Sequence, residues 1–280
     1  MYISIDIGGT NTRIATSENL DSIINLEKFH TPKSKKELVE KIAETIRENP
    51  NITMMSIGIA GFINRHTKQI IKCPHIPYLD NTSLNELLPQ TQNIPTYLEN
   101  DAALAGLAES IKGEGSNYNR VAYITISTGV GGTLIENKKI PDTKFNFEPG
   151  HHIIDLHPQN KVSTLLQGSW ESYSSGTAFK DLYKVEPDDY NDIGIWTEYG
   201  KNLAVGLHNI SLLWNPEVIV LGGSLSKKAT LFLKVLEDNL NATLPQGKPD
   251  IKISQLGDTN GILGGLELCR VRPDVGSNPN

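Results

Sequence analysis

Asp101, Glu148, His151 and Glu171 are the side chains of this sequence best suited to chemistry on hydroxyl groups. Asp101 stands where a strand-like run, 95–99, gives way to a helix-like run, so its carboxylate could take a proton from a hydroxyl or could cap the helix. The two glutamates and the histidine could fix the hydroxyl groups of a ligand in direction. Taken singly, each of these three would more often be a surface charge or a loop histidine.

Two glycine-rich segments could bind phosphate. Asp6-Ile-Gly-Gly-Thr-Asn11 and Ser127-Thr-Gly-Val-Gly-Gly-Thr133 each join two runs of alternating apolar residues. Glycines let several backbone N–H groups approach a phosphate, although a single such turn is more often an ordinary hairpin. Both segments continue as strands, which excludes a P-loop and a dinucleotide fingerprint. The repetition predicts phosphate contacts from Gly8, Gly9, Thr10, Asn11, Thr128, Gly129, Gly131 and Gly132.

The elements around these residues are predicted from apolar periodicity and capping signals. Strands are expected at 2–7, 12–16, 54–60, 95–99, 121–126, 133–136, 218–221 and 251–253. Helices are expected at 34–48, 101–112, 192–214, 227–239 and 261–270, with a short helix opened by the capping-box pair Ser83 and Glu86. The Gly- and Asn-containing run 113–119 is a plausible hinge.

Strand, glycine turn and strand occur twice, followed both times by βα units. This repetition predicts an α/β fold of two related lobes around a central cleft, with a duplicated βββαβα core, as in the actin, hexokinase and Hsp70 superfamily (ribonuclease H-like). The N-terminal lobe is expected at 1–112, joined by a C-terminal helix at 260–272. The C-terminal lobe is expected at 113–259, and 273–280 has the composition of a flexible tail.

Composition excludes several classes of protein. The chain has 280 residues, a net charge of −6 and no basic patch, which argues against a nucleic-acid partner. Its two cysteines, Cys73 and Cys269, are too few for a disulfide framework or a cysteine-based zinc site. Without a long apolar run or a basic leader, the sequence predicts a cytoplasmic protein with no membrane partner.

Five motifs in sequence order resemble those of the ROK (repressor, open reading frame, kinase) sugar kinases. They are the two glycine-rich segments, Glu99-Asn-Asp-Ala-Ala103, Glu148-Pro-Gly-His151 and Trp170-Glu-Ser-Tyr-Ser-Ser-Gly-Thr177, and the resemblance runs from Ile3 to about Leu268. It implies an enzyme that uses ATP and Mg²⁺ to phosphorylate the 6-hydroxyl of a hexose, with glucose as the first expectation. Fructose, mannose, N-acetylmannosamine and N-acetylglucosamine are the other candidate acceptors.

The resemblance also implies a role for each matching residue. Asp101 would be the catalytic base, and the sugar would be bound by Gly61, Asn100, Asp101, Glu148, His151 and Glu171. Asp6 would hold Mg²⁺ through water. Gly222 and Gly223 would contact adenosine, although they could also form an ordinary strand-end turn.

The family resemblance further implies a homodimer. ROK repressors carry an N-terminal DNA-binding segment, whereas this sequence starts at the phosphate strand, so a kinase is expected. A non-catalytic sugar sensor and a bare nucleotide-binding module are the alternatives from other classes.

Two departures from the family pattern affect the expectations. Most ROK proteins hold a zinc ion with three cysteines and the sugar-binding histidine, but 152–170 contains no cysteine, so structural zinc is expected to be absent. His152 and His157 could still join His151 on a metal, and packing by Leu165, Leu166 and Trp170 could replace the zinc. The segment 73–79 lacks the Asn and Trp common in the kinases, which leaves the acceptor less certain than the reaction.

Overall fold

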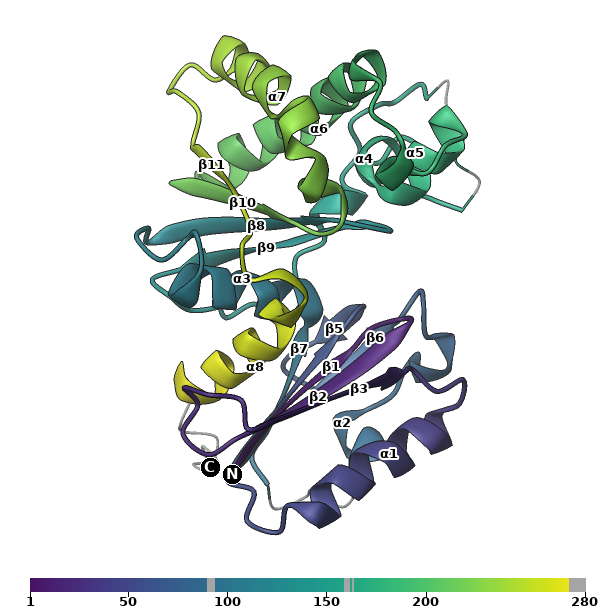
Figure 1. Cartoon of the computed structure of the whole chain (residues 1–280), viewed down its shortest axis with the longest axis vertical. Helices are drawn as coiled ribbons and strands as arrows, with labels where there is room; N and C mark the ends of the chain where they lie inside the picture. Colours follow the sequence, from purple (N-terminus) through teal and green to yellow (C-terminus); the bar gives the residue numbers. More distant parts are fainter. Residues whose placement is uncertain (90–93, 159–161, 163, 272–280) are drawn as a thin grey trace. The chain divides into compact units, whose positions relative to one another are not determined.

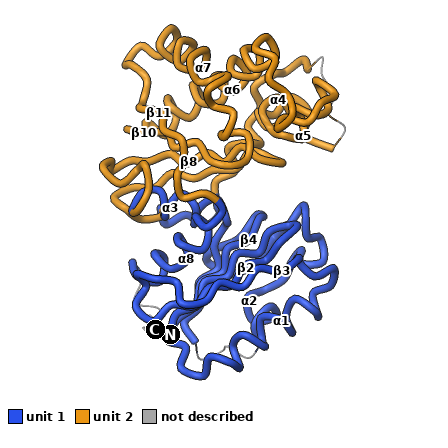
Figure 2. The backbone as a smooth tube through the Cα atoms, viewed as in Figure 1, with its two compact units in different colours: residues 1–111, 141–146, 258–280 blue, residues 112–140, 147–257 orange. Residues whose placement is uncertain are grey.

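The computed structural model describes residues 1–89, 94–158, 162 and 164–271. The chain divides into two compact units, shown in Figure 2: unit 1 comprises 1–111, 141–146 and 258–280, and unit 2 comprises 112–140 and 147–257. The short segment 141–146 therefore belongs to unit 1 although unit 2 flanks it on both sides. The predicted tail, 273–280, and residue 272 of the predicted C-terminal helix lie outside the described residues.

Unit 1 is built on a five-stranded sheet with the order β3-β2-β1-β4-β7. Its strands are β1 (Tyr2–Ile7), β2 (Asn11–Ser17), β3 (Asn25–His30), β4 (Met54–Ile59) and β7 (Thr96–Asn100). β1 and β2 form the predicted antiparallel hairpin, whereas β1, β4 and β7 are parallel. A separate hairpin, β5 (Phe62–Asn64) with β6 (Gln69–Lys72), follows β4.

Successive side chains of β1 point to opposite faces of this sheet, and a different helix packs on each face. Ile3, Ile5 and Ile7 share a core with α1 (Lys35–Glu48), which begins after its predicted cap, Ser34. Ser4, on the other face, donates a 2.9 Å hydrogen bond to the Ile262 carbonyl of α8 (Asn260–Val271). The two helices thus cover opposite faces of the sheet (Figure 1).

Two further helices of unit 1 follow sequence signals closely. α2 (Leu84–Leu87) begins with the predicted capping box, in which Ser83 and Glu86 bond each other's backbone N–H groups. α3 (Asp101–Lys112) starts directly after β7, where the strand-to-helix change was predicted.

Unit 2 repeats the strand order of unit 1 with one strand fewer among its described residues. Its sheet has the order β11-β10-β8-β9, formed by β8 (Arg120–Ile126), β9 (Val130–Glu136), β10 (Val218–Gly222) and β11 (Asp250–Ile253). β8 is antiparallel to β9 and parallel to β10, as β1 is to β2 and β4. No counterpart of β3 follows β9 in the described chain, and residues 141–146, which come soon after β9, belong to unit 1.

The helices of unit 2 are α4 (Glu171–Ser174), α5 (Gly176–Tyr183), α6 (Ile193–Trp214) and α7 (Ala229–Thr243). α6 begins directly after Asp192, the first residue of the expected helix, whose side chain accepts from the Gly194 and Ile195 N–H groups, and it packs beside α7 (Figure 1). α7 starts later than predicted because Leu225–Lys228 forms a 3₁₀ turn. Within the described residues, no helix has the length and apolar character needed to span a bilayer.

Candidate functional site

Two carboxylates of unit 1 lie at the same edge of its sheet. Asp6 is near the end of β1 and Asp101 directly follows β7, and the parallel strand β4 lies between them. In β4, Gly58 is aligned with Asp6 on one side and with Glu99 on the other. A side chain at Gly58 would come within 2.7 Å of Leu104 and 3.8 Å of the Asp101 Cα. The bare glycine therefore leaves room for Leu104 and for the backbone at the start of α3.

The environment of Asp6 and Asp101 favours their protonated forms. Burial and the charge of Asp101 raise the pKa of Asp6 to about 6, against the opposing effect of Arg13, whose Nη1 donates to Asp6 Oδ2 at 3.3 Å. Burial also raises the pKa of Asp101, although the Ala102 N–H donates to its Oδ1 at 2.9 Å and acts in the opposite direction. A carboxylate with a raised pKa is a better proton acceptor than an ordinary aspartate, which suits a general base.

The first glycine turn is held from the side by Thr31. The Thr31 hydroxyl donates to the Gly8 carbonyl at 2.6 Å, and its N–H donates to the Thr10 carbonyl at 3.0 Å. Inside the turn, the Gly8 N–H donates to the Asn11 carbonyl at 3.0 Å. Gly9 and Thr10 stay exposed at the tip, where an anion could reach them. Sequence reasoning missed Thr31, which follows an exposed strand, β3, with no apolar alternation.

Asn100 and Gly61 are in contact in unit 1. The buried Asn100 amide donates to the Gly61 carbonyl at 3.1 Å, and its Oδ1 accepts a 3.1 Å hydrogen bond from the Ala103 N–H. Asn100 therefore caps α3, a role that the sequence had suggested for the neighbouring Asp101. Asn146 adds a second donor to the Gly61 carbonyl at 3.3 Å, and it accepts from the Ile63 N–H at 2.9 Å. No sequence signal marked Asn146, which comes from the segment 141–146.

A buried ion pair supports the peptide that leads to Asp101. Arg65 and Glu99 have side-chain exposures of 6% and 3%, and the Arg65 Nε and Nη2 both donate to the Glu99 carboxylate at 2.8 Å. Glu99 Oε1 also accepts from the Asn100 N–H at 2.8 Å, and Arg65 Nη1 donates to the Phe145 carbonyl at 2.9 Å. The first residue of the Glu-Asn-Asp motif thus has a structural role that sequence analysis did not assign.

The second glycine turn, in unit 2, is shorter than predicted. It spans Ser127–Gly129, and it is held by the N–H groups of Gly176 and Thr177, which donate to the Ser127 and Thr128 carbonyls at 2.7 and 3.2 Å. Gly131 and Gly132 lie instead in β9, opposite Thr125 and Ile124. A side chain at Gly132 would come within 2.6 Å of the Tyr123 carbonyl and 3.0 Å of Pro149, so this glycine serves packing, and the prediction that it belongs to the turn is wrong.

Val130 joins the segments that carry Glu148, His151 and Glu171. Its N–H donates to Glu171 Oε2 at 2.7 Å, and its carbonyl lies so close to Gly150 that a side chain there would overlap it. Gly150 is part of the 3₁₀ turn Pro149–His151, in which the His151 N–H donates to the Glu148 carbonyl at 3.1 Å. The segments of these two predicted motifs are therefore gathered at the start of β9.

Protein contacts hold the segment between His151 and Glu171. The Gly168 carbonyl accepts from the N–H groups of Ile154 and Asp155 at 2.8 and 3.1 Å, and the Tyr173 hydroxyl donates to Asp155 Oδ2 at 2.5 Å. Trp170 is fully buried, as expected, but Leu166 is 56% exposed, so the prediction that it packs in place of zinc is wrong.

Protein groups engage several possible metal-binding atoms of this segment. The Asp155 carboxylate is engaged by Tyr173 and by the His157 N–H, and His152 Nδ1 is bonded to the Pro149 carbonyl. No group of three His, Cys, Asp or Glu side chains that could hold a metal occurs in the described part of the chain.

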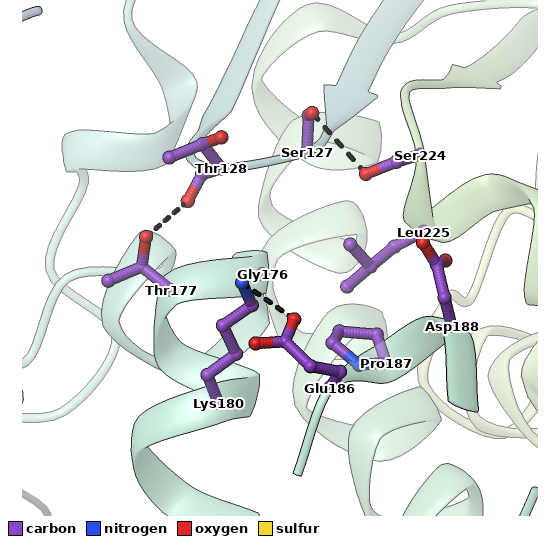
Figure 3. Close-up of a pocket in the computed structure, with 10 residues that line it drawn as sticks. All are labelled: Ser127, Thr128, Gly176, Thr177, Lys180, Glu186, Pro187, Asp188, Ser224 and Leu225. Atoms are coloured by element: carbon purple, nitrogen blue, oxygen red, sulfur yellow. Dashed lines mark hydrogen bonds and ion pairs between the residues drawn. The ribbon is translucent and has the colours of Figure 1, made fainter. Parts of the chain in front are cut away.

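A pocket of about 150 Å³ adjoins the second glycine turn within unit 2 (Figure 3). Its walls come from the turn itself, the start of α5, the 3₁₀ turn 187–189 and the residues after β10. Lys180 and Glu186 form a 2.6 Å ion pair on one side of it. The lining residues are Ser127, Thr128, Gly176, Thr177, Lys180, Glu186, Pro187, Asp188, Ser224 and Leu225.

Gly222 and Gly223 lie immediately before two residues of this pocket, Ser224 and Leu225. Gly223 has a φ of +86°, and a side chain there would overlap the Ile126 carbonyl. A side chain at Gly222 would overlap the Tyr123 hydroxyl. The glycine pair therefore turns the chain tightly over β8 and places Ser224 and Leu225 in the pocket wall.

The model of the ROK family matches residues 2–272. This chain belongs to the ROK family. It is 26% identical to a glucokinase of Streptomyces coelicolor, covering 98% of both chains, and 25% identical to an N-acetyl-D-glucosamine kinase of Haemophilus influenzae, covering 96% and 99%. It is also 29% identical to a xylose repressor of Bacillus spizizenii, covering 94% of this chain and 75% of the repressor.

The fold of this ROK protein is shared with solved structures. A ROK glucokinase from Streptomyces griseus, in complex with glucose and AMPPNP, superposes with a TM-score of 0.77 at 22% identity, covering 96% of this chain and 99% of that one. The predicted family and the actin/hexokinase-like fold are confirmed, and the relatives support the predicted enzyme class, a sugar kinase.

Proposed function

We propose that this ROK protein transfers the γ-phosphoryl group of ATP to the 6-hydroxyl of a hexose, with glucose as the acceptor. The observation that carries the proposal is the position of Asp101. Its carboxylate has a raised pKa and lies at the same sheet edge as the strand that leads into the first glycine turn. In phosphoryl transfer, such a carboxylate orients the acceptor hydroxyl and takes its proton.

The roles of the other residues follow from the resemblance of their motifs to those of the ROK kinases. Glu148, His151, Glu171, Gly61 and Asn100 would bind the sugar hydroxyls. Gly8, Gly9, Thr10 and Asn11 in one turn, and Thr128, Gly129 and Gly131 near the other, would contact the phosphates of ATP. The pocket beside Ser224 would take the adenosine, since it adjoins the second turn and offers hydroxyl and carboxylate groups to a nucleoside.

Asp6 fits the role of a Mg²⁺ ligand through water. Its carboxylate oxygens are hard donors, its pKa is raised by burial and by the neighbouring charge of Asp101, and a bound cation would relieve that repulsion. Mg²⁺ would neutralise charge on the phosphates of ATP. Asp6 would orient the water ligands, while Arg13 holds the Asp6 side chain in place through Oδ2.

Other acceptors and a second function follow from the relatives. The N-acetyl-D-glucosamine kinase supports amino sugars as alternative acceptors, beside fructose, mannose and N-acetylmannosamine. The xylose repressor supports a sugar-binding protein without kinase activity. We also propose that the protein is a homodimer, as the family resemblance implies.

The test is ADP release with Mg-ATP across glucose, fructose, mannose, galactose and their N-acetylamino relatives, with melting temperature measured in parallel. The proposal predicts sugar-dependent ADP release with glucose giving the highest kcat/KM. A higher kcat/KM with another sugar would replace glucose as the acceptor. Sugar-induced thermal stabilisation without ADP release would favour the sensor and contradict the kinase.

A further inference from the structure

A cavity of about 440 Å³ lies within unit 1 beside the first glycine turn. Three segments form its walls: Gly9 and Thr10 of the turn, residues 30–33 after β3, and residues 75–78 after β6. This volume is in the range of small-molecule pockets, which is about 300–1,000 Å³. Thr31 of the second segment holds the glycine turn, but none of the ligand contacts proposed above comes from the second or the third segment.

Hydrogen bonds tie the walls of this cavity together. Thr31 bonds the backbone of Gly8 and Thr10, which fixes the second segment to the turn. The Tyr78 hydroxyl donates to the Pro32 carbonyl, which fixes the third segment to the second. The third also meets the turn directly, because a side chain at Gly9 would come within 2.6 Å of the His75 Cβ. The cavity is therefore a built feature of the fold.

Its polar lining is basic. His30, Lys33 and His75 face it, and none of its described lining residues is acidic. Within the described residues Lys33 has no ion-pair partner, whereas the nearby Lys35 and Lys36 pair with Glu86 and Glu40. The lysine without an ion-pair partner therefore lines the cavity.

We propose that this cavity binds the phosphate group of a small phosphorylated molecule. The Lys33 ammonium group can donate charge-assisted hydrogen bonds to phosphate oxygens, and the imidazole N–H groups of His30 and His75 and the Thr10 hydroxyl are further donors. A hexose 6-phosphate and free inorganic phosphate share this chemistry. The site is a binding site, and it requires no phosphoryl transfer.

The test is calorimetric titration of the full chain, without nucleotide, with inorganic phosphate, glucose 6-phosphate and glucose. We compare the wild type with His30→Asn/Lys33→Gln, both exposed positions outside the proposed catalytic groups. The matched control is Lys36→Gln/His66→Asn, which makes the same charge change at exposed positions of unit 1 that do not line the cavity. Melting curves show whether each variant folds.

Loss of charge-assisted hydrogen bonds should weaken phosphate binding about tenfold or more in the cavity variant and leave the control unchanged. Tighter binding of glucose 6-phosphate than of inorganic phosphate would assign the sugar phosphate, and equal binding would assign free phosphate. Binding that the cavity variant leaves unchanged, or no phosphate binding by the wild type, would overturn the inference. ADP release by the same preparation tests the kinase separately.

Discussion

The Val130 N–H donates a 2.7 Å hydrogen bond to the Glu171 carboxylate. Val130 directly follows the second glycine turn, and Glu171 begins α4, so one carboxylate touches the strand that follows the proposed phosphate turn while serving as a proposed sugar ligand. A side chain at Gly129 would come within 2.5 Å of the same carboxylate oxygen, which shows how closely the two segments approach. A proposed sugar ligand, Glu171, is therefore in direct contact with the proposed phosphate-binding turn within unit 2.

Substitutions of Glu171 should separate its two contacts. Glu171→Gln keeps an acceptor for the Val130 N–H but loses the charge, so we expect little change in melting temperature and a rise in sugar KM of about 10–100-fold. Glu171→Ala leaves a buried N–H unpaired and should also cost about 1–3 kcal/mol in the free energy of unfolding. Glu198→Gln, on the exposed side of α6, is the control. Equal stability of the Ala and Gln variants would show that the hydrogen bond does not support the strand.

The buried pair of Arg65 and Glu99 should be needed for folding. Arg65→Met leaves the Glu99 charge buried without its partner, and we expect a loss of about 3–5 kcal/mol in the free energy of unfolding. Adding Glu99→Gln should recover part of this loss because the unpaired charge is removed. Denaturant unfolding measures both, with the exposed Arg47→Met as the control. If Arg65→Met is no more destabilising than Arg47→Met, the pair does not support the Asp101 segment.

The raised pKa of Asp101 predicts opposite effects of pH on activity and on stability. The base must be ionised, so kcat should fall as pH falls through this raised pKa. For the same group, the folded state binds the proton more tightly than the unfolded state, so its contribution to stability is greatest at low pH and is lost as pH rises from the ordinary aspartate pKa through the raised one.

Asp101→Asn removes this ionisation and the repulsion of Asp6. We expect its melting temperature at pH 7 to exceed that of the wild type by a few degrees, and the difference to shrink toward pH 4. Melting curves of both proteins between pH 4 and 8 measure this. A variant that is less stable than the wild type at pH 7 would contradict the raised pKa.

The hydrogen bond from Tyr173 to Asp155 should steady the segment that leads from His151 to Glu171. Burial and this bond raise the pKa of Tyr173 to about 12, so its hydroxyl stays protonated and the bond persists at neutral pH. Tyr173→Phe should raise the sugar KM severalfold and lower the free energy of unfolding by about 1 kcal/mol. Tyr118→Phe, which removes a similar bond to Asp250 elsewhere in unit 2, is the matched control for KM.

Chelation gives a second readout for the same segment. A chelator with high zinc affinity, removed before assay in excess Mg²⁺, should leave sugar KM and melting temperature unchanged. A rise in sugar KM or a fall in melting temperature that added zinc reverses would contradict the view that protein contacts alone hold this segment.

Sequence patterns correctly predicted the helices and strands that are determined by a few neighbouring residues. The capping box of α2, the alternation of β1 and β8, and the change from strand to helix at Asp101 are each read from a few consecutive residues. β3 was not predicted, because five of its six residues are exposed and an edge strand without a buried face has no apolar alternation. Gly132 was misassigned because a glycine needed for packing under Pro149 looks like one needed for a turn.

The supports of the candidate site depend on partners far away in the chain. Arg65 meets Glu99, Asn146 meets Gly61, and Thr31 meets the first glycine turn only after folding. No spacing rule relates these residues, so composition and periodicity could not find them. The residues expected to act chemically could be proposed from the sequence, because turns, a strand end and a Glu-x-x-His spacing are local patterns.

The most direct test of the central claim is the steady-state rate of ADP formation from Mg-ATP, with and without glucose, for the wild type and Asp101→Asn. Positioned general bases contribute about 10²–10⁴-fold, so the variant should lose that much of kcat while calorimetry still detects glucose binding. Near-normal kcat in a folded, glucose-binding Asp101→Asn protein would remove Asp101 from the mechanism. ADP formation by the wild type that does not depend on any sugar would contradict a sugar kinase.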